Sequence, residues 1–196
     1  VQQVQGTSGA FAAIQADGFV ITWGHPDAGG VSSAVHDQLR NVQQVQGTGS
    51  AFAAILAAGS VVTWGCPLNG GDSSAVQDQL RNVQQVQGTS GAFAAIQADG
   101  FVITWGHPDA GGVSSAVHDQ LRNVQHTGSA FAAILAAGSV VTWGCPLNGG
   151  DSSAVQDQLR NVQKVQCTSG AFAAILADGS VVTWGHPDLG GDSSAV

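Results

Sequence analysis

The sequence predicts an all-β fold built from tandem repeats, and three observations carry this prediction. The 196 residues divide into five repeats of one unit, which span 1–41, 42–82, 83–123, 124–161 and 162–196. Each repeat holds three short segments of high strand propensity, separated by turns rich in Gly and Ser. Each also carries a Trp-Gly pair at the same place. We expect one domain over residues 1–196, because each unit buries its apolar face only against its neighbours.

The second repeat shows the expected strands in order. Val42–Gln46 alternates apolar and polar residues and reads as a first strand, followed by a turn at 47–50. Ala51–Leu56 and Ser60–Gly65 flank a short turn and predict a hairpin. Both faces of this hairpin carry apolar groups, so we expect each sheet to be stacked between two similar sheets.

The hairpin turn of the first repeat contains an Asp-Gly pair beginning at Asp17, which is typical of a two-residue loop. Such a loop would set Ala12 opposite Trp23 and Phe11 opposite Gly24. Each large ring would then face a small residue across the hairpin.

The second and fourth repeats replace this pair by Ala-Gly, with Ala58 and Ala137 at the first turn position. Alanine in the left-handed conformation is strained. We therefore expect these two hairpins to be weaker by about 1 kcal/mol.

A Pro-containing, Gly-rich loop follows the last strand of each repeat. It alternates between His-Pro-Asp and Cys-Pro-Leu forms while the hairpin stays constant, and variation on a fixed scaffold is where binding is expected. The residues expected to form an interaction rim are His25, Asp27, Cys66, Asn69, His107, Asp109, Cys145, Asn148, His186 and Asp188.

The segment after the loop has two readings. Ser73 could cap a short helix that runs to Leu80, or Ser74–Gln77 could form a brief outer strand. The sequence leaves both open.

Short strands every 40 residues or so, with a fixed Trp-Gly, predict a β-propeller-like array of five short blades. The alternative is an open β-solenoid of stacked hairpins. The tail Ser193–Val196 could pair beside Val1–Gln5 and close a ring. The fourth repeat lacks three residues of its first strand, so that blade should be damaged or paired differently.

Composition narrows the classes of partner. The chain is acidic, with a net charge of −8, and its five basic residues are dispersed, so nucleic-acid binding is disfavoured. No apolar run approaches the ~20 residues of a membrane helix, so we expect no membrane span. The three Cys form no CxxC pair and are expected to be free thiols.

Catalytic, metal and cofactor sites are not expected. The His/Asp pairs of the rim loops are replaced in alternate repeats, whereas a metal needs several converging ligands. There is no Gly-x-Ser-x-Gly elbow, P-loop or dinucleotide fingerprint. The five Trp would pack between blades or stack on sugar rings, and burial of aromatic strand residues favours the first role.

Ala171–Gly185, with its Asp-Gly turn and final Trp-Gly, resembles the regulator of chromosome condensation repeat, as do Gly190-Gly191 and the Ser-Ser at Ser193. The resemblance covers all five repeats and implies a β-propeller. In this family the middle strand begins with His, where this chain has Ala. The founding member is a nucleotide-exchange factor that binds nucleosomes, but this chain has no insertion comparable to its exchange elements. Many relatives are interaction modules, including parts of ubiquitin ligases.

We therefore expect a non-catalytic scaffold that binds a protein partner through its rim loops. One alternative is a five-bladed carbohydrate-binding lectin that uses the same rim. Another is a structural subunit or a fragment of a larger array. An oligomer also remains open, because near-identical repeats favour misregistered pairing between chains.

Overall fold

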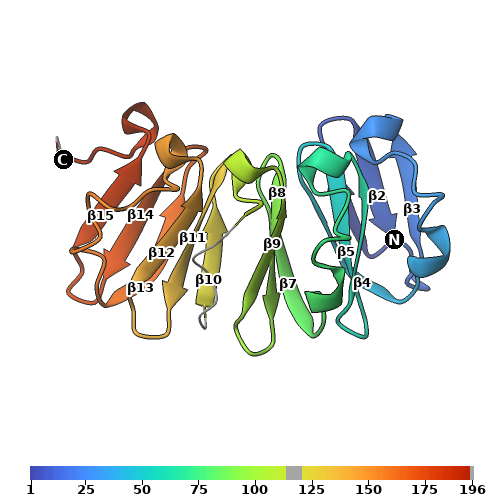
Figure 1. Cartoon of the computed structure of the whole chain (residues 1–196), viewed down its shortest axis with the longest axis horizontal. Helices are drawn as coiled ribbons and strands as arrows, with labels where there is room; N and C mark the ends of the chain where they lie inside the picture. The colour runs from blue at the N-terminus through green and yellow to red at the C-terminus, as the bar shows by residue number, and fades with distance from the viewer. Residues whose placement is uncertain (114–120, 195–196) are drawn as a thin grey trace.

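A computed structural model describes residues 1–113 and 121–194, which form five separate three-stranded antiparallel sheets arranged side by side (Figure 1). Each sheet is one blade. The first strands are β1 (Gln3–Gly6), β4 (Val42–Gly47), β7 (Val83–Gly88), β10 (Leu121–His126) and β13 (Val162–Cys167). The middle strands are β2 (Ala10–Ile14), β5 (Ala51–Leu56), β8 (Ala92–Gln97), β11 (Ala130–Leu135) and β14 (Ala171–Leu176). The last strands are β3 (Val20–Gly24), β6 (Val61–Gly65), β9 (Val102–Gly106), β12 (Val140–Gly144) and β15 (Val181–Gly185).

Short 3-10 helices complete each blade. Those that follow the last strand are η1 (Pro26–Ala28), η3 (Pro67–Asn69), η5 (Pro108–Ala110), η6 (Pro146–Asn148) and η7 (Pro187–Leu189). The linkers to the second and third blades contain η2 (His36–Gln38) and η4 (Gln77–Gln79). No helix among the described residues is long and apolar enough to cross a membrane.

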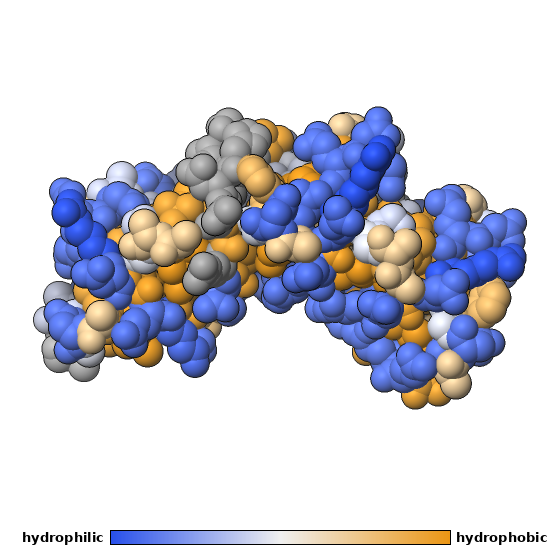
Figure 2. Space-filling model, turned by 90° about the horizontal axis from the view of Figure 1, so that it is seen from below, coloured by the Kyte–Doolittle hydropathy of each residue, from blue (hydrophilic) through white to orange (hydrophobic). Residues whose placement is uncertain are grey.

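The core lies between blades, as the apolar pattern on both sheet faces predicted. At the first junction, Ile14 and Val20 of one sheet pack against Phe52 and Trp64 of the next. Equivalent clusters fill the other junctions. Figure 2, which views the array from below, shows hydrophobic residues between and beneath the polar ones and a curved outline.

The expected hairpin register is wrong by one residue. Phe11 pairs with Trp23 instead of Gly24, and their rings stack at a centroid distance of 5.4 Å. The cause is the turn: Ile14 pairs with Val20, so the loop is longer than two residues, and only Gly18 adopts the left-handed conformation (φ 80°). This is the longer hairpin class, in which glycine ends the turn.

The expected strain at Ala58 and Ala137 is absent for the same reason. The left-handed residue of each turn is the following glycine, Gly59 (φ 77°) or Gly138 (φ 83°). Among the described residues, the only non-glycines with positive φ are four asparagines. The second and fourth hairpins therefore carry no alanine penalty.

The segment after the rim loop forms neither the expected helix from Ser73 to Leu80 nor a strand at Ser74–Gln77. It is a turn followed by the single-turn helix η4. Leu80, at the end of this turn, is buried in the junction between the second and third blades. The linker therefore supplies an apolar anchor to the blade interface.

The shortened fourth repeat is accommodated by different pairing. Its first strand, β10, begins with Leu121, a residue of the preceding repeat, which takes the place that Val83 holds in β7. The Leu121 amide donates to Gly100 O at 2.8 Å, as Val83 does to Gly59 O. Leu121, Arg122 and Asn123 thus replace the three missing residues, and β10 keeps the six-residue length of β7.

The expected closure of the array by its tail is not observed. The first strand β1 pairs with β2 alone in the described sheets, and the fifth sheet lies at the opposite end of the array (Figure 1). Ser193 bonds the Thr183 hydroxyl at 3.0 Å instead, while 195–196 lie outside the described residues. The described blades thus form an open array.

Candidate interaction surface

The rim loop of each blade is fixed by glycine and proline. In the first blade, Gly24 ends β3 with φ 116°, and a Cβ there would lie 2.5 Å from Gly9 O. The next amide, of His25, donates to that same oxygen at 2.8 Å. The His25 imidazole then accepts from the Asp27 amide at 3.2 Å, and Gly29 (φ 90°) terminates η1. The local sequence therefore determines the loop shape.

A threonine after the first strand holds the rim loop in place. Thr7 Oγ1 donates to Ala28 O at 2.9 Å and accepts from the Ala10 amide at 3.0 Å. The same lock recurs in every blade through Thr48, Thr89, Thr127 and Thr168. The rim is therefore preorganised by backbone and hydroxyl bonds, which lowers the entropy lost when a partner binds.

A chain of backbone hydrogen bonds connects the turns of neighbouring blades along this rim. Ser8 N donates to Gly49 O, Gly49 N to Ser90 O, Ser90 N to Gly128 O and Gly128 N to Ser169 O, at 2.8–2.9 Å. We call this chain the turn ladder. It fixes the spacing between successive rim loops.

The structure places all ten predicted rim residues in these loops, which point to one edge of the array (Figure 1, top). Capping differs among the loops, because His25 and His107 accept a bond inside the loop, whereas Cys66, Cys145 and His186 do not. The exposed members are His25, Asp27, His107, Asp109 and Asp188, and the half-buried members are Cys66, Asn69, Cys145, Asn148 and His186.

Three of the ten residues meet in one groove. Asn69 of the second blade lies with His107 and Asp109 of the third around a cavity of about 440 Å³. Ser8 and Ser90 of the turn ladder, with the neighbouring Ser50, complete its wall. We call this the rim groove. It offers hydroxyl, amide, imidazole and carboxylate groups at fixed positions, which suits recognition of a polar surface.

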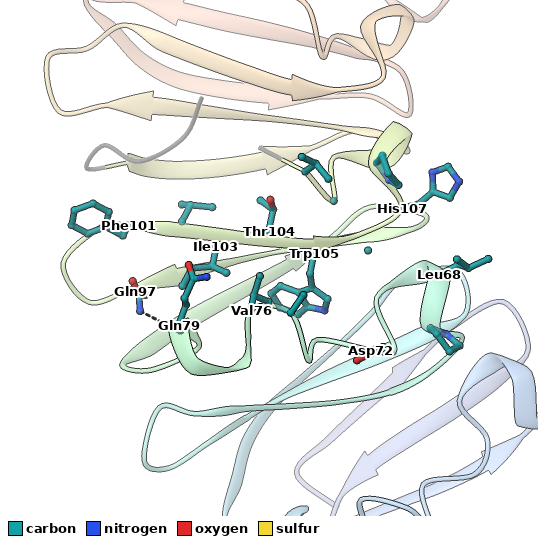
Figure 3. Close-up of a pocket in the computed structure, with 17 residues that line it drawn as sticks. Leu68, Asp72, Val76, Gln79, Gln97, Phe101, Ile103, Thr104, Trp105 and His107 are labelled. Carbon is teal, nitrogen blue, oxygen red and sulfur yellow. Dashed lines mark hydrogen bonds between the residues drawn. The ribbon is translucent and has the colours of Figure 1, made fainter. Parts of the chain in front are cut away.

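A second groove, on the side of the array, was not predicted (Figure 3). Its volume is about 890 Å³, and its apolar wall includes Val76, Phe101 and Ile103. It forms where the linker of one blade meets the last strand of the next. Strand alternation marks Phe101 and Ile103 as one face, but only the fold brings Val76 to them.

Exposed carboxylates beside the rim are held in their charged form. Asp72, which lines this second groove, accepts from the Ser74 amide at 2.9 Å, and this bond lowers its pKa. Ser153 and Ser194 lower the pKa of Asp151 and Asp192 in the same way. These bonds cap the turns and keep the loops negatively charged.

The described residues include no group of three or more His, Cys or Asp that could hold a metal ion. All three thiols are unpaired. Burial raises the pKa of Cys167, partly offset by a bond from the His126 backbone, which favours the protonated thiol near neutral pH.

The tryptophans lie between blades in four of the five repeats, as the sequence favoured. Trp64, Trp105 and Trp184 each donate their indole N–H to a glycine carbonyl of the preceding blade at 2.9–3.0 Å. Trp143 is equally buried, but its Nε1 has no partner. These four rings are not available to stack on a sugar.

No family model and no curated protein sequence matches the chain. Solved structures do. The ectodomain of the Physcomitrella patens receptor kinase CR4 matches with a TM-score of 0.62 and 18% identity, over 93% of this chain and 52% of that one. Human WBSCR16 matches with a TM-score of 0.56 and 18% identity, over 93% of this chain and 61% of that one. Prp20p from Saccharomyces cerevisiae matches with a TM-score of 0.58 and 13% identity, over 93% of this chain and 57% of that one.

Prp20 is the yeast regulator of chromosome condensation, the protein that gives the repeat its name. This match therefore supports the resemblance described for the sequence. The chain spans between about half and three fifths of the length of these three proteins. Their low identity shows the fold alone. The chain therefore has the propeller-like fold of the regulator of chromosome condensation repeat, as an open array of five blades.

Proposed function

We propose that residues 1–196 are one repeat domain, a scaffold without catalytic activity that binds a protein partner through its rim loops. The observation that carries this proposal is the rim groove, in which Asn69, His107 and Asp109 converge on a rigid frame. Rigid loops that vary between blades on a constant core are suited to recognition.

The charge of the rim favours a partner with a basic surface. Asp27, Asp109 and Asp188 are exposed in three of the five loops, and the chain as a whole carries −8. Complementary charge steers association and selects partners. Prp20p, which shares the fold, is described by its binding to Gsp1p and histones, so protein binding is a use to which this fold is put.

The carbohydrate-binding alternative has less support. Aromatic rings that stack on sugars must be open to solvent, and four of the five tryptophans are buried between blades. We therefore propose a protein partner and keep sugar binding as an outcome of the test.

The test compares two charge-matched variants. In the rim variant, Asp27, Asp109 and Asp188 become Asn. In the control, Asn replaces the three aspartates at the hairpin tips of the same blades, Asp17, Asp99 and Asp178. Both variants lose the same charge, and Asn can still accept the turn hydrogen bonds of the control positions.

We expect proteins captured from extract by the parent chain to be lost with the rim variant and retained with the control. Equal retention by both variants would contradict rim binding. Specific signals on a glycan array would instead make the rim a set of sugar sites.

A further inference from the structure

One kind of interface is repeated at every junction inside the array. The middle and last strands of one blade present Ala and Ile or Val side chains, as at Ile14 and Val20. The next blade presents a stacked Phe-Trp pair, as at Phe52 and Trp64, with ring centroids 5.2 Å apart. We call the first surface the tail face of a blade and the second the head face. Each internal junction is thus a tail face covered by a head face.

A glycine of the rim loop completes each junction. A Cβ at Gly29 would lie 2.6 Å from the Phe52 ring, so only glycine lets the loop reach this close. The equivalent glycines of the other internal junctions, Gly70, Gly111 and Gly149, stand at the same 2.6 Å from the next Phe. The ring pair is therefore enclosed by the strand edge and loop of the preceding blade.

The first blade has its head face uncovered. Phe11 is 48% exposed and Trp23 46%, against 0% and 5% for Phe52 and Trp64. Ile21, on the same face, is 43% exposed. Phe11 and Trp23 still stack, so the surface already has its bound shape. A preformed apolar surface of this kind is rare on a monomer unless something binds it.

The fifth blade has its tail face uncovered. Ile175 is 37% exposed and Val181 56%, against 1% and 2% for Ile14 and Val20. Gly190 keeps the left-handed conformation of Gly29 (φ 100°), yet nothing described lies within 4 Å of its Cβ position. The loop is thus shaped to cover a ring pair that the fifth blade does not meet.

The two open faces also carry matching hydrogen-bonding groups. In three internal junctions the indole donates to the glycine carbonyl, and Trp23 Nε1 and Gly190 O are the corresponding groups at the two ends. The turn ladder ends at Ser169 and begins at Ser8, so the Ser169 amide and the Ser8 carbonyl are a second matching pair. Both pairs would form in the geometry seen inside the array.

We propose that copies of this chain associate head to tail, with the first blade of one copy packed on the fifth blade of the next. The occupant follows from the array itself, because each of the four covered head faces among the described residues packs against a tail face of this repeat. Such a heterologous contact gives a ring if the curvature closes and an open chain of copies if it does not.

The new junction is smaller than the internal ones. Three of the four internal junctions also bury a linker leucine (Leu39, Leu80 or Leu159), and the fifth blade has no counterpart among its described residues. We therefore expect reversible association. Because every copy carries a net charge of −8, added salt should strengthen it by screening repulsion.

The test is sedimentation velocity on the purified 196-residue protein from about 1 µM to several hundred µM. We expect the average mass to rise with concentration. Ile21→Asp places a charge in the head face and Val181→Asp in the tail face, and each should weaken association at least about tenfold. Leu68→Asp is the matched control, since Leu68 is exposed in a rim loop away from both end faces and should leave association unchanged.

Mixing the two variants identifies the geometry. The Ile21→Asp chain keeps an intact tail and the Val181→Asp chain an intact head, so an equimolar mixture should form dimers and nothing larger. Circular dichroism of each variant establishes that it is folded. A parent chain that stays monomeric throughout, or a mixture of folded variants that stays monomeric, would overturn the proposal.

Discussion

The buried tryptophans allow a test of what one hydrogen bond contributes to a blade junction. Trp105 and Trp143 occupy equivalent places and are 4% and 6% exposed, but only Trp105 donates its indole N–H, to Gly70 O at 2.9 Å. Replacement by Phe removes about the same ring area from both. Trp105→Phe also leaves the Gly70 carbonyl unpaired, whereas Trp143→Phe removes a donor that is already unpaired.

The difference can be worked out from these contacts. A net hydrogen bond contributes about 0.5–1.5 kcal/mol, and an unpaired buried group costs about 1–3 kcal/mol. Trp105→Phe therefore loses the hydrogen bond and also leaves a buried carbonyl unpaired. Trp143→Phe loses ring packing but removes a buried N–H that was already unpaired, which offsets part of the loss. We expect Trp105→Phe to lower the free energy of unfolding by about 2 kcal/mol more than Trp143→Phe.

Urea unfolding followed by circular dichroism measures this difference. Because repeats in an array can unfold separately, indole N–H exchange by NMR supplies a local reading. The Trp64, Trp105 and Trp184 indoles should exchange slowly, and that of Trp23 fast. Equal destabilisation by the two Phe variants, within about 0.5 kcal/mol, would refute the reasoning.

Three further outcomes follow from the turns and loops. Gly70→Ala should destabilise the chain by at least about 2 kcal/mol more than Gly190→Ala in urea unfolding, because both glycines have positive φ but only at Gly70 would the Cβ lie 2.6 Å from the Phe93 ring. Ala58→Asp should raise the free energy of unfolding by about 0.5–1 kcal/mol, because the carboxylate can accept from the amide two residues on, as Asp178 does at 2.9 Å. The hydroxyl and amide of Ser180 lower the pKa of Asp178. The contribution of Asp178 to stability is therefore full above about pH 4 and is lost as the pH falls further. The urea midpoint of Asp178→Asn should decline less in acid than that of the parent chain.

The repeat unit was predictable because its signals are local. Strand alternation, Gly-rich turns and a fixed Trp-Gly define three strands and a rim loop without reference to other parts of the chain. The hairpin register could not be predicted, because an Asp-Gly pair is compatible with both two-residue and longer loops. The choice between them depends on which turn residues take positive φ, and the structure assigns that conformation to Gly18 alone.

Exposure within the array could not be predicted from the repeat. The first and third repeats are identical in sequence, yet Trp23 is nearly half exposed and Trp105 is buried. The same letters even adopt different structures: Leu39 ends a linker turn, while its counterpart Leu121 starts strand β10 because the repeat that follows is shorter. Environment here is a property of position in the array, which is why the rim groove and the two end faces emerge only from the structure.

The turn ladder has a consequence for how such a chain can evolve. Its bonds join backbone to backbone, so they do not depend on the side chains of the turn, and Ser and Gly alternate in it without interruption. An added unit can therefore join the ladder through the same backbone bonds, whatever the side chains of its turn. The fourth repeat shows that a unit shorter by three residues still forms a three-stranded blade, because Leu121, Arg122 and Asn123 of the preceding repeat fill its first strand.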